Sequence, residues 1–241
     1  MLDNSARFKP DQDDVFGRIA HRYDRLCDVF SFGIHRLWKS QMAARIMAEE
    51  GRHLLDLASG TADIPCRLWR RLGSSAGDWR IRVSDVSSPM LEIAHRKLDA
   101  LDARISLEIQ DAGQIDAADG SIDIVSMAFG LKITDRSRVM TQVLRVLRPG
   151  GVFLCLEASR IVVPGLHQLY LAYMDLCMPW IGRLATGGDA SAYAYLLRGV
   201  HEFPDQRALA AEMRDHGFED VTFESLSLGI VALHRAVKPT S

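Results

Sequence analysis

The sequence predicts one α/β domain with a doubly wound, mostly parallel sheet and helices on both faces. Two observations lead to this fold class. Short apolar runs with strand composition alternate with segments of helical periodicity along residues 53–158. At residues 58–62 a turn of small residues joins such a run to a helical segment, which is how a βαβ unit opens. Two further strands near the end of the chain bring the expected sheet to seven strands, within a single domain over residues 13–241.

Two helices are expected before the first strand. Apolar residues recur at helical spacing over 15–26 and again over 34–47, and a Phe-Ser-Phe-Gly stretch separates the two patterns. Residues 13–50 are therefore expected to form an N-terminal helical cap, preceded by a flexible stretch at 1–12. Such a cap either covers the mouth of a ligand site or packs as a solvated cover.

The central elements alternate strand and helix. Ser87-Ser88-Pro89 marks a helix start, because serine caps helices and proline fits the first helical position. Asp135 is placed to cap a later helix, and a turn is expected at 149–151. Strands are expected at 54–57, 81–85, 104–109, 121–127, 152–157, 218–225 and 228–235, and helices at 64–72, 90–98, 139–147 and 204–217.

The segment 164–183 is apolar and rich in aromatic residues and methionine, and Pro179 is expected to interrupt it. A loop at 187–189 and a short helix at 193–201 follow. We expect residues 164–204 to form a helical lid over the substrate. The same composition also suits a core segment, a surface that rests on a membrane, or the wall of a pocket for an apolar substrate.

Composition excludes several classes of protein. Of the 241 residues, 48% are hydrophobic and 25% charged, as in soluble globular domains, and the net charge is −2. No basic field favours nucleic acid, and no apolar run reaches the roughly 18 residues that span a bilayer. The four cysteines are far apart and indicate free thiols in a reducing cytoplasm, and the scattered histidines predict no metal site. We expect a cytoplasmic protein, with a peripheral contact at the inner membrane face and a homodimer left open.

The turn after the first strand indicates an adenosine ligand. It holds a single glycine, Gly60, instead of the G-x-G-x-x-G of dinucleotide sites, and Asp56 before it suits an ammonium or sulfonium group better than a phosphate. Asp85, at the end of the second strand, is placed to accept hydrogen bonds from a ribose diol. Asp111 is placed to accept one from an adenine amino group, or else caps a turn. Residues 56–63 with Asp85 resemble the pattern of class I S-adenosylmethionine (SAM) methyltransferases, which have a Rossmann-like fold.

Several segments spread over residues 15–238 carry a more specific resemblance. These segments are Tyr23-Asp24, 31–39, 129–131, 145–151, 157–159, 193–196, 201–206 and 229–235. They are similar to those of the ubiquinone/menaquinone C-methyltransferase (UbiE) family, and this resemblance implies SAM as methyl donor and a polyprenylated quinol precursor as acceptor. Carried over by position, it places SAM contacts at Thr61, Asp85, Asp111 and Ala112, and Tyr23-Asp24 near the reacting centre.

These observations give three sets of candidate residues. Lys132, Tyr23 and Asp24 are the candidates for catalysis: Lys132 to stabilise a phenolate, and the other two to orient water or an acceptor hydroxyl. The candidate cofactor-binding residues are Asp56, Ala58, Gly60, Thr61, Asp85, Val86, Met90, Asp111, Ala112 and Ala128. The candidate substrate-binding residues are Tyr23, Cys27, His35, Phe129, Lys132, Ile133 and Tyr195.

Several positions depart from the family pattern. Cys27 and Gly188 replace asparagines, Ala128 replaces a serine, Lys132-Ile133 replaces Arg-Asn, and Ala62 replaces a glycine of the turn. A buried polar group without its partner costs roughly 1–3 kcal/mol, so these losses indicate an altered acceptor. Three hypotheses stay open: C-methylation of a prenylated quinol or phenol, methylation of another lipophilic acceptor (an aromatic secondary metabolite or isoprenoid), and a catalytically silent SAM-binding subunit.

Overall fold

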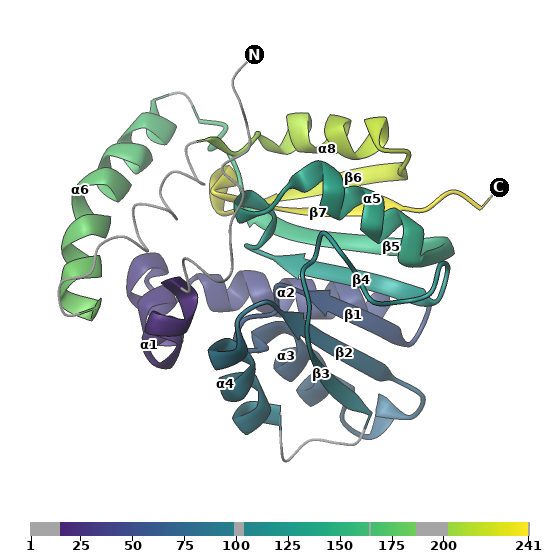
Figure 1. Ribbon diagram of the computed structural model, residues 1–241. Helices are drawn as coiled ribbons and strands as arrows, with labels where there is room; N and C mark the ends of the chain where they lie inside the picture. The colour runs from purple at the N-terminus through teal and green to yellow at the C-terminus, as the bar shows by residue number, and fades with distance from the viewer. Residues whose placement is uncertain (1–14, 99–103, 164, 187–201, 241) are drawn as a thin grey trace.

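The computed structural model describes residues 15–98, 104–163, 165–186 and 202–240. Seven strands in these residues form one sheet, in the order β3-β2-β1-β4-β5-β7-β6 (Figure 1). Within it β7 alone runs antiparallel to its neighbours, so the predicted mostly parallel sheet is confirmed. The strands are β1 (His53–Leu57), β2 (Arg80–Asp85), β3 (Ile105–Ile109), β4 (Ile122–Ala128), β5 (Leu147–Ala158), β6 (Glu219–Leu226) and β7 (Val231–Val237).

Helices cover both faces of the sheet (Figure 1). One core lies between the sheet and α2, α3 and α4, and the other lies between the sheet and α5 and α8. α1 packs against α4 and α6 instead of against the sheet. The helices are α1 (Val15–Ser31), α2 (His35–Ala48), α3 (Asp63–Leu72), α4 (Ser88–Leu98), α5 (Arg136–Val146), α6 (Leu166–Thr186) and α8 (Gln206–Asp215), with short 3-10 turns η1 (Gly73–Ala76), η2 (Leu131–Ile133) and η3 (Ser227–Gly229).

The central strands are apolar on both faces because both faces are covered. Leu54 belongs to the core with α2, α3 and α4, and its neighbour Leu55 belongs to the core with α5 and α8. Ile124 and Val125 in β4 divide in the same way. Such continuous apolar runs are typical of buried parallel strands, and they are the signal from which the sheet was predicted.

Two helices begin at a capping carboxylate, and one of these, Asp135, was predicted from the sequence. The Asp135 carboxylate accepts a hydrogen bond from the backbone N–H of Arg138 at 3.1 Å and so begins α5 as expected. Asp205 begins α8 in the same way, with the N–H groups of Arg207 and Ala208 both at 2.9 Å. These carboxylates satisfy backbone donors that a helix leaves free in its first turn.

Several bounds differ from the prediction. β7 begins at Val231 and not at 228, because the 3-10 turn η3 occupies Ser227–Gly229. α6 is continuous through Pro179, because a proline removes a single backbone donor and the turns on either side continue the helix. β5 begins at Leu147, ahead of the turn expected at 149–151, because Leu147 already pairs with Ile122 of β4. Gly150 and Gly151 are tied to Lys238 by two backbone hydrogen bonds of 2.9 Å. The helix expected at 193–201 lies outside the described residues.

Candidate functional site

The turn between β1 and α3 has an unusual backbone. Ala58, Gly60 and Ala62 all lie in the left-handed region, with φ of 48°, 56° and 60°. A side chain costs roughly 1–2 kcal/mol in that conformation, so the two alanines hold strain. A Cβ built on Gly60 would meet no atom within 4 Å, so the space above this residue is open. A ligand can therefore approach the backbone at Gly60.

Asp85 holds this turn against the end of β2. One carboxylate oxygen accepts the backbone N–H of Gly60 at 2.8 Å, and the other accepts that of Ser87 at 2.9 Å. The N–H of Ser59 donates to the carbonyl of Ser84 at 2.9 Å. Asp85 is 9% exposed. The sequence placed Asp85 near the turn, and the structure brings the two together.

Asp56 is buried under the same turn. Its carboxylate is 1% exposed and accepts hydrogen bonds from the hydroxyls of Ser59 and Ser126. Burial raises the pKa of Asp56 to about 6, although these two hydroxyls and Lys39 act in the opposite direction. The charged form is thus costly in the protein alone, and a cation placed above the turn would stabilise it.

The other candidate cofactor residues lie along the same edge of the sheet. Asp111 follows β3 and accepts the N–H of Gly113 at 2.8 Å, so it does cap a turn as well. Ala112 is buried beside it, and Ala128 ends β4. Val86 follows Asp85, and Met90 on α4 is buried. The ends of the neighbouring strands β3, β2, β1 and β4 therefore bring all ten candidates to one edge, where ligands of open α/β sheets bind.

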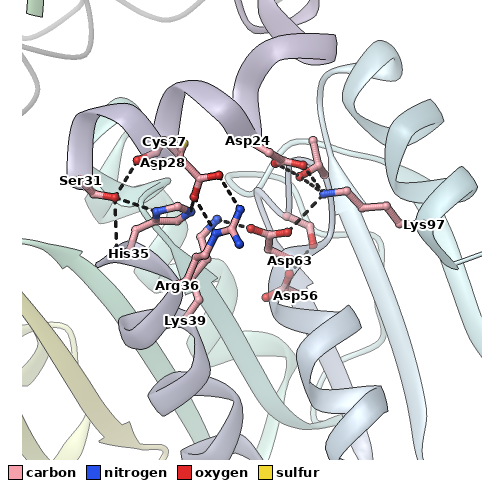
Figure 2. A network of polar contacts seen from close by, with 12 residues as sticks. Asp24, Cys27, Asp28, Ser31, His35, Arg36, Lys39, Asp56, Asp63 and Lys97 are labelled. Carbon is pink, nitrogen blue, oxygen red and sulfur yellow. Dashed lines mark hydrogen bonds and ion pairs between the residues drawn. The ribbon is translucent and has the colours of Figure 1, made fainter. Parts of the chain in front are cut away.

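A network of charged side chains connects α1 to the turn (Figure 2). The Thr61 hydroxyl donates to Asp24 of α1 at 2.7 Å. The ammonium group of Lys97, from α4, donates to Asp24 at 2.6 Å, to Thr61 at 2.8 Å and to Asp63 at 3.2 Å. Lys39 of α2 donates to the other oxygen of Asp63 at 2.8 Å. Four helices thus meet at the first residue of α3.

Asp63 is the acidic centre of this network. Its partial burial raises the pKa of the carboxyl, but the ammonium groups of Lys39 and Lys97 outweigh burial and bring the pKa below its usual value. Asp63 therefore stays ionised at neutral pH. Two cations on one carboxylate hold the N-terminus of α3 in place, immediately after the turn.

Tyr23, Cys27 and His35 lie close to this network. The nearby Cys27 raises the pKa of Tyr23 well above its usual value, and burial raises the pKa of the Cys27 thiol. Both groups are therefore neutral at pH 7, and a neutral thiol is a poor nucleophile. Burial also lowers the pKa of His35 to about 4, and its ring nitrogen lies 2.7 Å from the Ser31 hydroxyl. His35 is a neutral imidazole under physiological conditions.

Lys132 occupies a different environment from the one expected. Its side chain is 6% exposed, and its ammonium group donates to the fully buried Glu157 at 3.0 Å and to the carbonyl of Phe129. Phe129 has a left-handed backbone with φ of 58°, and its ring lies 6.3 Å from that of Trp38. Ile133 ends η2 beside them. Tyr195 and Gly188 lie outside the described residues.

The structure adds functional candidates that sequence reasoning missed. Sequence reasoning assigned no role to Lys97 or Glu157. The contacts of Lys97 depend on how α1 packs against α4, and those of Glu157 depend on the pairing of β4 with β5. Lys39 and Glu157 stood in segments similar to the family, and Asp63 directly follows the turn, so these three carried a local signal. The described helices include none long and apolar enough to cross a bilayer, and the described side chains form no metal-ligand group.

The residues present at this edge fit SAM. Gly60 leaves the backbone open to a ligand, and Asp85 ends β2, the strand end at which nucleotide-binding α/β folds carry the acidic residue for a ribose diol. The buried Asp56 supplies negative charge beside the turn, which suits a ligand that carries an ammonium and a sulfonium. A polyphosphate would meet repulsion at the same place.

Comparisons with known proteins agree with this arrangement. A model of the ubiE/COQ5 methyltransferase family matches residues 4–238. The ubiquinone/menaquinone biosynthesis C-methyltransferase UbiE of Acidiphilium cryptum is 40% identical over 225 residues, covering 92% of this chain and 88% of that protein. The protein of the same name from Francisella philomiragia is 36% identical over 227 residues, covering 93% and 89%.

Solved structures show the same fold at low identity. A SAM-dependent methyltransferase from Thermotoga maritima has a TM-score of 0.66 at 18% identity, and the match covers 93% of this chain and 98% of that one. A phosphoethanolamine N-methyltransferase from Haemonchus contortus, in complex with SAM, has a TM-score of 0.55 at 16% identity, covering 78% and 49%. The predicted family, fold and cofactor are confirmed, while the roles of single residues stay predictions. The chain belongs to the ubiE/COQ5 methyltransferase family and is a SAM-dependent methyltransferase.

Proposed function

We propose that this enzyme transfers the methyl group of SAM to a ring carbon of a prenylated quinol or phenol. The relatives named above are C-methyltransferases of ubiquinone and menaquinone biosynthesis, and they match nearly the whole chain. The observation that carries the proposal is an apolar cavity of about 220 Å³ beside the cap. It is lined by Ile161, Leu166, Leu169, Tyr170, Tyr173, Leu228 and Ile230. An isoprenoid tail suits such a lining because burial stabilises apolar surface by about 25 cal/mol per Å².

Contacts connect this cavity with the edge of the sheet where the cofactor residues lie. Tyr173 on α6 has its ring 6.3 Å from that of Phe32, which follows α1. Ser227, next to the cavity residue Leu228, accepts a hydrogen bond from the Trp38 indole at 2.9 Å. The ring of Trp38 in turn lies against Phe129, directly after β4. A tail in the cavity would therefore leave its ring within reach of the segment that follows β4.

We assign the turn 58–62, Asp85 and Asp111 to the cofactor, with Asp111 toward the adenine and Asp85 toward the ribose. SAM supplies a methyl group already activated by its sulfonium. The chain itself supplies alignment, which contributes up to about 7–11 kcal/mol when two reactants are held in register. The bonds of Thr61 and Lys97 to Asp24 support this assignment, because they hold α1 against the turn.

Tyr23 and Asp24 are our candidates for handling the acceptor hydroxyl. The pKa of Tyr23 is raised, so its neutral hydroxyl can donate a hydrogen bond to a quinol oxygen at neutral pH. Asp24 pairs with the Lys97 ammonium at 2.6 Å and accepts the Thr61 hydroxyl at 2.7 Å, which fixes its carboxylate where it can orient a water or a hydroxyl. If that hydroxyl passes its proton to the oriented water, the charge on its oxygen raises electron density at the ring carbon that takes the methyl. The methyl–sulfur bond would break as the carbon–carbon bond forms, and the ring proton would then leave to water.

A second acceptor class is favoured by one observation. The thiol of Cys27, at a position where the family has asparagine, is half-buried beside Tyr23 and neutral. It offers an acceptor no strong hydrogen bond, and Ala128 offers none either. Another lipophilic acceptor, such as an aromatic metabolite or an isoprenoid, would tolerate both changes.

Membrane contact, a homodimer and a cytoplasmic location remain proposals. Exposed apolar side chains border the cavity, with Leu169 at 66%, Leu228 at 62% and Phe32 at 78% exposure. A lipophilic acceptor that resides in the bilayer would be reached most directly from such a surface. Flotation of the purified protein with vesicles, and sedimentation at several concentrations, test the first two.

The decisive experiment follows the methyl group. Purified protein is incubated with methyl-labelled SAM and membrane lipids from a strain that lacks its quinol methyltransferase, and the lipids are examined by mass spectrometry. Label on a ring carbon of the demethylated quinol supports the proposal. A matched variant, K132R/I133N, restores the Arg-Asn of the family. Label from the variant but not from the parent would show that the acceptor has changed, and label on another lipid would identify the new one.

A further inference from the structure

Glu157 in β5 stands at the centre of a buried set of hydrogen bonds. It is fully buried, and its carboxylate accepts the Lys132 ammonium at 3.0 Å, the Lys132 backbone N–H at 3.1 Å and the Ala158 N–H at 2.8 Å. Both of its oxygens are therefore in use. Two of the three donors belong to a residue on the neighbouring loop, so the carboxylate ties β5 to the segment that follows β4.

Lys132 extends this connection to Phe129. Its ammonium group donates to the Phe129 carbonyl, and the Phe129 N–H donates to the Leu156 carbonyl at 2.8 Å. Phe129 needs such support, because a bulky residue at φ of 58° is strained. Strained backbone of this kind persists where the surroundings determine it from several sides. The bonds on either side of Phe129 hold its ring against Trp38.

The same contacts make Lys132 unsuited to serve a phenolate. With 6% exposure and Glu157 as partner, its charge is already matched inside the protein. Turning the ammonium toward an acceptor would leave the Glu157 carboxylate buried and unpaired, which is strongly unfavourable. The geometry therefore disfavours the catalytic role expected from the sequence.

We propose that Glu157 is a positioning residue, which acts through Lys132 to fix residues 129–133 as the wall between the cofactor edge and the acceptor. Lys132 is on this proposal a structural cation and not the counter-charge of the phenolate. The inference rests on the proposed function, because the importance of this wall follows from an acceptor bound beside Ala128. It assigns a role to a residue at which sequence reasoning found none.

Four variants test the proposal: E157Q, K132R, K132M and the double variant E157Q/K132M. E157Q keeps the shape but leaves a buried ammonium without a counter-charge, and we expect kcat to fall about tenfold or more while the Kd for SAM changes less than about threefold. K132R keeps the charge, so its kcat should stay within about threefold of the parent. The double variant removes the unmatched charge, and its kcat should exceed that of E157Q by at least about threefold.

The opposite role predicts a different pattern. If Lys132 contacts the phenolate, K132M and the double variant lose turnover to the same extent, and the double variant is no better than E157Q. The acid limb of the kcat–pH profile then also shifts in K132R, because an arginine replaces the group that meets the phenolate. Either result overturns the proposal, as does an E157Q enzyme with the kcat of the parent.

A measurement without acceptor separates this proposal from the proposed function. In the presence of SAM, hydrogen exchange at amides 129–133 should be faster in E157Q than in the parent, while amides 58–63 stay unchanged. Equal exchange at 129–133 overturns the positioning role even if no acceptor is known. If E157Q does not fold, K132M compared with K132R carries the same test, with faster exchange expected in K132M alone. If the unmutated enzyme labels no quinol, the proposed function is refuted, but the hydrogen-exchange result for residues 129–133 still holds.

Discussion

Replacing Lys97 with methionine should loosen α1 from the turn that receives the cofactor. The Lys97 ammonium donates to Asp24 at 2.6 Å, to Thr61 at 2.8 Å and to Asp63 at 3.2 Å. Methionine retains most of the length and the apolar part of the side chain, but none of these donors. Asp63 keeps the Lys39 ammonium at 2.8 Å, whereas Asp24 keeps the uncharged Thr61 hydroxyl at 2.7 Å. Removing the Lys97 ammonium therefore mainly weakens the contact between α1 and the turn.

The size of the effect follows from partial burial. The side chains of Lys97, Asp24 and Asp63 are 27%, 39% and 21% exposed, so solvent screens the charges in part. Fully exposed ion pairs contribute up to about 1 kcal/mol, and hydrogen bonds to charged groups about 1.5–3 kcal/mol. We expect K97M to destabilise the docked position of α1 by about 1–2 kcal/mol, which multiplies the undocked population about 5- to 30-fold.

Hydrogen exchange of the α1 amides measures this population directly. Exchange over residues 20–31 should rise by that factor in K97M at pH 7.5, and the Kd for SAM should rise with it, since α1 covers the turn. R45Q is the matched control, because Arg45 bonds Glu224 at 2.8 Å with side chains 59% and 49% exposed. Its exchange in α1 should equal that of the parent. If the α1 amides exchange at the same rate in K97M and in R45Q, Lys97 does not hold α1 against the turn.

Three further predictions concern the turn itself. D85A should weaken SAM binding at least about tenfold by calorimetry, because the ribose diol loses a charged acceptor; D85N is the isosteric comparison, and an unchanged Kd in both would remove Asp85 from the cofactor site. Burial raises the pKa of Asp56 from 3.8 to about 6, so its contribution to stability is fully present below pH 3.8 and is lost as pH rises through about 6. That loss is worth about 3 kcal/mol, so in urea unfolding the stability of D56N relative to the parent should rise by up to this amount between pH 4 and pH 7, and a constant difference would contradict the placement. A Cβ on Gly130 would lie 2.6 Å from the Cβ of Ala58, so the urea concentration at the unfolding midpoint should be lower for G130A than for the parent. Adding A58G to G130A should recover most of that decrease in stability. No recovery in the double variant would mean that another contact dominates.

The order of the elements was predictable because each one carries a local signal. Apolar runs mark the strands, small residues mark the turn after β1, and Asp135 caps α5 as its position indicated. Asp56, Asp85 and Asp111 were predicted for the same reason: each stands at the end of a strand, and the ends of parallel strands meet at one edge.

The partners of Lys97 and Glu157 were not predictable from such signals, although Glu157 ends the predicted strand 152–157. The contacts of Lys97 exist because α1 packs against α4, a pairing that no residue pattern announces. For Lys132 the sequence gives the charge of the side chain but not its partner. Its charge was read correctly, but the residue that faces it is set by the pairing of β4 with β5, so its partner is Glu157 and its carbon chain is buried.

The turn that contains Ala58 and Ala62 keeps its shape although one of its residues differs from the family. Ala62 replaces a glycine and takes the left-handed conformation nonetheless, as Ala58 does four residues earlier. The carboxylate of Asp85 holds Gly60 between them, and the methyl of Ala58 fills the space that Gly130 leaves on the opposite side. The cofactor turn therefore keeps its shape through contacts with β2 and with the segment after β4. The change at Cys27 lies outside these contacts, on α1, so we expect divergence to alter acceptor choice before it alters SAM binding.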